Sequence, residues 1–498
     1  MKHRYLEPPP PRQTARYLFS NGQIVLLAAA GLGLAVGLAF APHATLVVLV
    51  AAATSFYALF VGLKLTMHVA SHHYKPPALE PADVNDPSLP VYTVFVPLYK
   101  EANMLPSLVR SLDSLQYPKG KLQVLLLLEE DDLETQAEAI GMELPDWYEV
   151  VVVADLLPKG KPKALNMGLA QARGAFSVIY DAEDRPDPDQ LLKAVAGFRA
   201  APMNVGCLQA RLRFWNDDTS WVTRFYGVEY IVHFERVLPG LAKLGLIPPL
   251  GGTSNHFRTD VLRKVAIQDH KLPQGAQGIG GWDPWNVTED AELAGALTLQ
   301  GYRVLIIDSS TREEATAHMR IANKQRQRWL KGYLQTGLVY SRVPLKTAWN
   351  MGFGKWLCYI LLMLGTPVSL WLNPVFWALT VVYFSTRSAF IESLFPPVLL
   401  YGGFTLMLVG NLLLIFQMIS ACLHREVYAS VKFMPLAPLW WAFTSWSAYR
   451  VIWQLCRKST RHKWDKTTHG HDIHKEELPE TEATPQILGA AWVDESRN

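Results

Sequence analysis

The segment NKQRQRWLKGY, residues 323–333, decides how this chain is organised. In a helix, Gln325, Arg328 and Trp329 are spaced i, i+3 and i+4, so they share one face. An amide, a guanidinium and an indole on one face can bind an anion and stack on a ring. Strongly apolar sequence begins soon after this segment. We therefore predict that this face lies where a soluble domain meets a membrane.

The composition indicates a protein that is part membrane and part soluble. The chain has 498 residues, 50% of them hydrophobic, and its mean hydropathy of +0.08 is too apolar for an average soluble enzyme. Its 18% of charged residues are too many for a membrane bundle alone. The formal net charge of +3 provides no basic field, so we expect no nucleic-acid partner. The four cysteines lack metal-ligand spacing and are predicted to be buried free thiols.

Two apolar runs, residues 23–42 and 44–65, stand near the start of the chain. Each has about the length that a bilayer crossing needs, and a very short turn joins them. We therefore predict a transmembrane hairpin at 22–68 that follows a cytoplasmic segment at 1–21. Basic residues before the first run and after the second place both ends of the hairpin in the cytoplasm.

Residues 77–345 have the composition of a globular domain. Strand-like runs within PVYTVFVPLYKE and LQVLLLLEEDD, and the run FSVIY, alternate with helical patterns. This order predicts an α/β domain with a mostly parallel sheet. Ligands of such sheets bind beyond the carboxyl ends of the strands, which is where the acidic residues of this sequence follow.

Residues 346–457 are apolar again and are predicted to form transmembrane or interfacial helices. Pro367 and Pro374 leave two alternatives for the first run, 356–384: a hairpin or one kinked span. The last run, 434–456, either crosses the membrane or is re-entrant or interfacial. Both alternatives return residues 458–498 to the cytoplasm as a polar tail.

The acidic motifs have two readings when each is taken alone. Asp181 and Glu183 follow a buried strand, and acids on such a turn can hold a hard divalent cation, but the same turn can simply cap a helix. Thr288 and the acids after it also resemble an ordinary helix N-terminus. Trp329 alone is more often a packing residue, and Arg328 alone a solvated charge.

Taken together and in order, these motifs resemble the family 2 glycosyltransferases that are embedded in membranes and act processively, the cellulose-synthase-like and curdlan-synthase-like enzymes. The resemblance rests on the segments at 129–131, 159–166, 181–184, 288–290 and 325–329. It implies a GT-A-like α/β domain in the cytoplasm, inserted between N- and C-terminal transmembrane helices. It also implies an integral protein of a bacterial plasma (inner) membrane.

The resemblance implies an inverting, processive transfer from a UDP-sugar to a growing polysaccharide chain. The preferred donor is UDP-glucose, and the product is a β-glucan exopolysaccharide that leaves through a channel formed by residues 346–457. The expected cofactor is Mg²⁺ or Mn²⁺. The expected partners are the donor, the polysaccharide, the lipid bilayer, and accessory export or regulatory proteins.

The resemblance also assigns residues. Asp290 matches the general base, in a catalytic segment formed with Thr288 and Glu289. The metal ligands are Asp181 and Glu183, with Asp184 as an alternative to Glu183, because this chain carries glutamates where many relatives carry aspartates. The predicted UDP-sugar-binding residues are Glu130, Lys161, Asp181, Gln325 and Arg328, and the predicted acceptor-binding residues are Gln209, Thr253 and Trp329.

The segment WDKTTHG, residues 464–470, resembles a gating loop that closes over the bound nucleotide. Lys466, Thr467 and His469 are expected to bond phosphate oxygens, with Trp464 at the start of the loop. The alternative is a basic segment held by anionic lipid.

Two other functions are compatible with parts of this pattern. A non-processive transferase that moves one sugar to a lipid carrier needs the acids but not the segment at 325–329 followed by several membrane segments. A polysaccharide transporter without catalysis needs the membrane helices but not the ordered acids.

Overall fold

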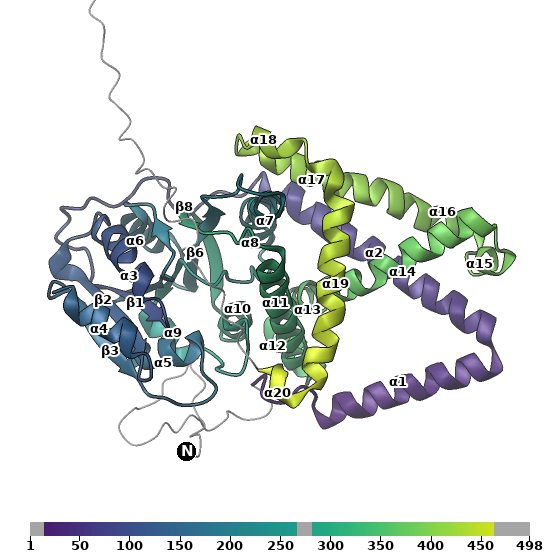
Figure 1. The fold of residues 1–498 in the computed structure, drawn as a ribbon, viewed down its shortest axis with the longest axis horizontal. Helices are drawn as coiled ribbons and strands as arrows, with labels where there is room; N and C mark the ends of the chain where they lie inside the picture. Colours follow the sequence, from purple (N-terminus) through teal and green to yellow (C-terminus); the bar gives the residue numbers. More distant parts are fainter. Residues whose placement is uncertain (1–13, 266–280, 463–498) are drawn as a thin grey trace, which may run out of the picture.

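The computed structural model describes residues 14–265 and 281–462. An α/β domain lies on one side, and apolar helices extend away from it on the other (Figure 1). The domain contains one sheet of eight strands in the order β3-β2-β1-β4-β7-β6-β8-β5. The strands are β1 Tyr92–Leu98, β2 Leu122–Glu129, β3 Tyr148–Val153, β4 Phe176–Ile179, β5 Arg185–Pro186, β6 Val205–Phe214, β7 Asn255–Arg258 and β8 Arg303–Glu313.

The sheet is mostly parallel, as predicted. Strands β3, β2, β1 and β4 run parallel, and β6 is parallel to β8. Strand β7 is antiparallel to both of its neighbours, and the short edge strand β5 is antiparallel to β8. The carboxyl ends of β1, β2 and β4 therefore meet at one edge of the sheet.

Helices cover both faces of this sheet. One core cluster joins the sheet to α3 (Leu105–Asp113) and α6 (Gln190–Ala200), and the other joins it to α5 (Lys161–Gln171), α9 (Thr259–Val265) and α10 (Glu289–Leu299). Along β2, Leu125 and Leu127 belong to one cluster while Val124 and Leu126 belong to the other. Burial of both faces explains why this strand reads as a continuous apolar run.

Glycine at position 168 lets α5 lie directly on the sheet. A Cβ there would be 2.9 Å from a methyl group of Leu127 and 3.1 Å from the ring of Phe95. A larger residue would push the start of α5, which carries Lys161, away from the ends of the strands.

Four helical stretches are long and apolar enough to cross a membrane within the described part of the chain. They are α1 (Asn21–Phe40), α2 (Pro42–Ser71), α14 (Gly365–Thr386), and Pro397–His424, which consists of α16 (Pro397–Thr405), the π-helical turn η4 (Leu406–Gly410) and α17 (Asn411–His424). Pro374 lies inside α14. The run at 356–384 therefore consists of most of the short α13 (Phe353–Met363) and of α14, which continues through Pro374 and is long enough to cross a membrane.

Helix α11 (Met319–Tyr340) packs against α19 (Ala437–Cys456), and α19 also packs against α14. In Figure 1, α19 lies across the domain-side ends of the helices that extend away from the α/β domain. It is not among the helices apolar enough to span. This arrangement favours the interfacial alternative for residues 434–456.

Short elements connect these parts. Helix α7 (Trp221–Val232), the π-helical turn η3 (His233–Val237) and α8 (Leu238–Lys243) follow β6, and α2 packs against η3 and α8. The remaining helices are α4 (Leu133–Gly141), α12 (Pro344–Met351), α15 (Ala389–Ser393), α18 (Tyr428–Val431) and α20 (Lys458–Arg461).

Candidate active site

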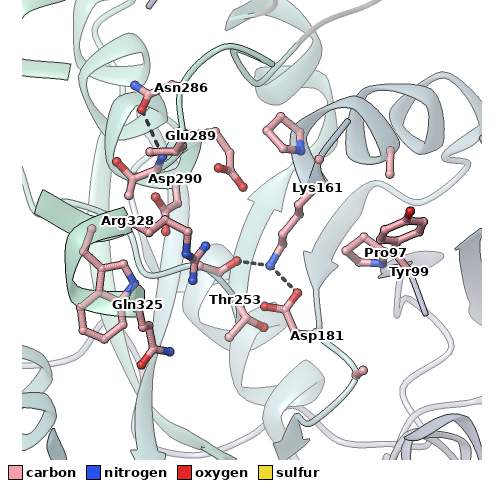
Figure 2. Close-up of a pocket in the computed structure, with 18 of the residues that line it drawn as sticks. Pro97, Tyr99, Lys161, Asp181, Thr253, Asn286, Glu289, Asp290, Gln325 and Arg328 are labelled. Atoms are coloured by element: carbon pink, nitrogen blue, oxygen red, sulfur yellow. Dashed lines mark hydrogen bonds and ion pairs between the residues drawn. The ribbon is translucent and has the colours of Figure 1, made fainter. Parts of the chain in front are cut away.

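A cavity of about 180 Å³ lies beyond the carboxyl ends of the parallel strands. Its lining includes residues from the end of β1, the start of α5, the turn after β4, the start of α10, the end of β8 and one face of α11. Figure 2 shows Lys161 and Asp181 paired on one side of this cavity, with Asp290, Arg328 and Gln325 on the opposite side. Motifs that are far apart in the sequence therefore face one space.

The turn after β4 separates its acids into two roles. Asp184 is 1% exposed and accepts hydrogen bonds from the Asp181 backbone N–H at 2.7 Å and from the Thr253 hydroxyl. Asp181 and Glu183 line the cavity, and Asp184 does not. Of the two candidates for the second metal ligand, the geometry thus favours Glu183.

The carboxylates around this turn carry more negative charge than the single positive charge of Lys161 can balance. Burial, and next the charge of Asp181, raise the pKa of Glu183 to about 7. Burial and the acids of the turn also raise the pKa of Glu313, which arrives from the end of β8. Lys161 pairs with Asp181 and donates a hydrogen bond to the Gly252 carbonyl at 2.7 Å. Burial lowers the pKa of Lys161, but the charges of Asp181 and Glu289 have the larger effect, and the pKa is raised.

This shortage of positive charge fits a divalent cation held by the carboxylate oxygens of Asp181 and Glu183. Within the described residues, no group of three His, Cys, Asp or Glu side chains is arranged to hold a metal ion.

A second pair of acids stands at the start of α10. Burial and the charge of Asp290 raise the pKa of Glu289 to about 7, and burial raises the pKa of Asp290 against the opposing Ala291 N–H, Lys161 and Arg328. Both carboxylates line the cavity. A carboxylate with a raised pKa is a better proton acceptor, which suits general-base chemistry.

Helix α11 holds this segment in place. Asn286 accepts from the Thr288 N–H at 3.1 Å and donates to the Thr336 hydroxyl at 2.8 Å, while Gln335 accepts from the Val287 N–H at 3.2 Å. At Gly332 an added Cβ would be 2.1 Å from the Thr288 hydroxyl oxygen, so only glycine permits this approach. Thr288 thus packs against α11, and it also lines the cavity beside Glu289 and Asp290.

Gln325, Arg328 and Trp329 line the cavity together, as their helical spacing predicted. Arg328 makes no hydrogen bond or ion pair with any other residue that the structure describes. Arg326, in contrast, pairs with Glu229 and lies 4.9 Å from the centre of the Tyr226 ring. The guanidinium available for an anion is thus that of Arg328.

Two predicted contacts are not brought to the cavity. Glu130 is exposed and accepts the Asp155 backbone N–H at 2.9 Å, while Glu129 lines the cavity instead and pairs with buried Lys163 at 2.6 Å. Gln209 is fully buried and holds the loop at 251–254 from beneath. Its side-chain amide forms hydrogen bonds with backbone groups, so Gln209 does not contact a sugar acceptor directly.

Two other predicted residues line the cavity, and their side chains are bonded to residues of the protein. Thr253 lines the cavity, but its hydroxyl bonds Asp184 and the Ile179 carbonyl. Lys161, the first residue of α5, pairs with Asp181 of the acidic turn.

Several lining residues were missed by sequence reasoning. Pro97 and Tyr99 follow β1, and the strand-end position was the available signal for them. His462 also lines the cavity, with its ring nitrogens 3.0 Å from the Trp285 carbonyl oxygen and 3.1 Å from that of Arg16. The gating-loop residues Trp464, Lys466, Thr467 and His469 lie outside the described residues.

Residues 178–418 match the family described as Glycosyl transferase family group 2. The chain is 25% identical over 256 residues to "Probable glycosyltransferase YdaM" of Bacillus subtilis, covering 50% of this chain and 56% of the relative. It is 24% identical over 290 residues to "Probable glucomannan 4-beta-mannosyltransferase 1" of Arabidopsis thaliana (56% and 50% covered). It is 27% identical over 286 residues to "Beta-monoglucosyldiacylglycerol synthase" of Synechocystis (56% and 55% covered). The chain thus spans about half the length of these relatives.

The fold is similar to that of "Mannosyltransferase PcManGT from Pyrobaculum calidifontis in complex with GDP-Man and Mn2+". The TM-score is 0.50 at 20% identity, with 79% of this chain and 99% of that chain covered. Together with the family match, this similarity confirms the predicted GT-A-like domain flanked by apolar helices.

Proposed function

We propose that this chain, whose glycosyltransferase family 2 domain is that of a nucleotide-sugar hexosyltransferase, is a processive inverting enzyme of a bacterial inner membrane. It transfers sugar from a UDP-sugar, preferably UDP-glucose, to a growing β-linked polysaccharide on the cytoplasmic side. One observation carries the proposal: the face formed by Gln325, Arg328 and Trp329 lines the same cavity as both acid pairs, on a helix packed against the membrane region.

Asp290 takes the proton from the acceptor hydroxyl in this proposal. The acceptor oxygen then bonds to the anomeric carbon of the sugar from the side opposite to the diphosphate. The bond from that carbon to the diphosphate oxygen breaks, and its electron pair leaves with UDP. The configuration at the anomeric carbon is therefore inverted.

The other charged residues serve the departing diphosphate. Arg328 can donate two parallel hydrogen bonds to its oxygens. Asp181 and Glu183 would hold Mg²⁺ or Mn²⁺, and the bound cation neutralises the negative charge of the diphosphate. Support comes from the charge shortage around these acids and from the Mn²⁺ named for the structurally similar mannosyltransferase.

The acceptor side is aromatic and leads toward the membrane region. Trp329 and Tyr230 both line the catalytic cavity, with ring centres 6.0 Å apart. A second cavity of about 230 Å³, here called the membrane cavity, lies among α2, α14, α16 and α19. Aromatic rings and amides suit sugar rings, and those lining this cavity include Tyr57, Phe376, Trp377, Tyr383, Phe404, Trp441, Asn373 and Asn411.

The largely apolar wall of the membrane cavity also favours a second candidate function. A lipid chain bound there would place a lipid acceptor beside the transferase domain, and the relative in Synechocystis is named for a glucosyldiacylglycerol product. The two candidates differ in what receives the sugar and share the chemistry at Asp290.

The segment at 464–470 is proposed to close over the bound nucleotide. His462 already lines the cavity, and Trp464 follows two residues later. A chain of seven residues extends at most about 25 Å, so His469 is within reach of the diphosphate.

The test is an assay of purified membranes with UDP-glucose labelled in the sugar. We expect UDP release together with label in a product that is retained as polymer and cut by linkage-specific β-glucanases. Label in a lipid-extractable monosaccharide alone would favour the second candidate. No nucleotide turnover with any UDP-sugar would overturn both and favour a transporter.

A further inference from the structure

Four arginines gather where α2 and α17 end against the α/β domain. This arginine cluster consists of Arg211 and Arg213 on β6, Arg236 on the π-helical turn η3, and Arg425 directly after α17. It lies outside the lining of both cavities. Its residues take no part in the sugar transfer proposed above.

Two carboxylates are in contact with the cluster. Glu235 lies 3.1 Å from Arg211, 3.6 Å from Arg213, and in an ion pair with Arg425. Asp308 pairs with Arg211 from the other side. Four guanidinium groups therefore surround two contacting carboxylates, which leaves positive charge without a counterpart.

Arg236 carries the clearest sign of a missing partner. It is 4% exposed, and it makes no hydrogen bond or ion pair with any residue in the described ranges. Burial lowers its pKa, Glu235 opposes this, and the nearby charge of Arg425 lowers it further. A buried guanidinium without a partner is costly, so an anion from outside the chain would stabilise it.

Two neighbouring features fit a binding site. The turn η3 is π-helical, a rare conformation that occurs frequently at functional sites. His68, on the last turns of α2 where that helix packs against η3, is 8% exposed and its Nδ1 has no partner among the described residues. Both features stand beside Arg236.

The position of the cluster identifies the kind of anion. Residues at the domain-side ends of two spanning helices lie at the depth of the lipid headgroups of that leaflet. A guanidinium binds phosphate oxygens in a planar, two-point geometry. We propose that the arginine cluster binds the phosphate of an anionic lipid headgroup, with Arg236 and Arg425 as its principal contacts.

The test measures which lipid the full chain retains. The protein, purified in detergent, is equilibrated with an equal mixture of phosphatidylglycerol and phosphatidylcholine, and the bound lipid is quantified by native mass spectrometry. The wild type should retain phosphatidylglycerol preferentially. Arg236→Gln should weaken this retention about tenfold, because a charge-assisted contact to phosphate is lost. Arg387→Gln, at the far end of α14, is the matched control and should retain lipid as the wild type does.

Arg425→Gln is the second variant, since it leaves Glu235 with two arginine partners and keeps the test open if Arg236→Gln misfolds. Thermal unfolding should show a rise in Tm on adding phosphatidylglycerol for the wild type and a smaller rise for both variants. Unchanged retention and unchanged Tm shifts in the variants would overturn the proposal and leave the cluster as a clamp between domain and membrane. Equal stabilisation by inorganic phosphate and by phosphatidylglycerol would overturn the lipid as the source of the anion.

Discussion

The two cavities of this protein differ in how they can recognise a ligand. The catalytic cavity is lined by five acids of the turn, of α10 and of β8, facing Lys161 and Arg328. The membrane cavity is lined mainly by aromatic and aliphatic side chains, and Lys64 and Glu392 are its charged residues within the described chain. The first selects by charge and the second by shape and ring stacking. A charged nucleotide is therefore expected to stay in the first cavity, and a neutral product is suited to the second.

The largest effect should come from removing the base in the catalytic cavity. Asp290→Asn should lower polymer synthesis about 100- to 10,000-fold, because the acceptor hydroxyl loses its proton acceptor. Nucleotide binding, measured by UDP titration, should survive. The exposed Asp260→Asn on α9 is the control. Polymer synthesis near the wild-type rate would show that Asp290 is not the general base. It would also weaken the inference that the catalytic cavity recognises its ligand by charge.

Removal of divalent cations should have the next largest effect. Chelation should lower UDP release about 100-fold or more, because the diphosphate then leaves without charge neutralisation. Mg²⁺ or Mn²⁺ should restore the rate. Glu183→Gln should raise the metal concentration needed for half-maximal rate, whereas Asp184→Asn should chiefly lower the Tm. Full activity in thorough chelation would show that Asp181 and Glu183 serve another purpose.

Acidic pH should weaken metal binding. The pKa of Glu183 is raised to about 7, so this carboxyl is ionised above pH 7 and protonated below it. Because a metal ligand must be deprotonated, the apparent Kd for Mn²⁺ should rise about tenfold for each pH unit below 7. A Mn²⁺ titration between pH 5.5 and 7.5 measures this slope, and Glu183→Gln should flatten it. A flat wild-type profile would contradict the assignment.

The tail variant His469→Ala tests whether the catalytic cavity is closed by a loop. UDP release should fall about tenfold through loss of one charge-assisted hydrogen bond to phosphate. His471→Ala, two residues further on, is the control and should keep the wild-type rate. Equal rates for both variants in detergent would favour the lipid-held alternative for this segment.

The smallest effect is expected in the membrane cavity. Phe376→Ala should shorten the polymer or slow its growth about fivefold, the equivalent of about 1 kcal/mol of lost stacking. UDP release with a short soluble acceptor should stay the same. Phe416→Ala, an exposed residue of α17, is the control. If Phe376→Ala left polymer growth unchanged but altered the lipid products, the second candidate function would replace the first.

The parts of the fold that were predicted from sequence are those whose signal is local. Strands β1 and β2 are buried on both faces and read as continuous apolar runs. Strand β8 alternates between buried, half-buried and exposed positions, and its RVLIIDSSTRE sequence was not recognised. The spanning length of α14 depended on whether Pro374 bends or breaks the helix, which neighbouring helices decide.

The same distinction holds for the candidate site. The shared face of Gln325, Arg328 and Trp329 follows from helical spacing alone, and the structure shows it. Glu313 reaches the cavity because β8 pairs with β6 in a register that only the folded sheet defines. Gln209 was assigned to an acceptor because sequence does not reveal that its amide satisfies buried backbone groups.

The contact between Gly332 and Thr288 has a consequence for how a polymer would advance. Because the Thr288 side chain lies directly on Gly332, the start of α10 packs closely against α11, and we expect this contact to keep Asp290 and Trp329 at one spacing. Asp290 and Trp329 would then define a fixed distance within which each new sugar unit is positioned. If the enzyme is processive, as proposed above, we expect translocation by one unit to occur by sliding of the sugar chain past Asp290 and Trp329.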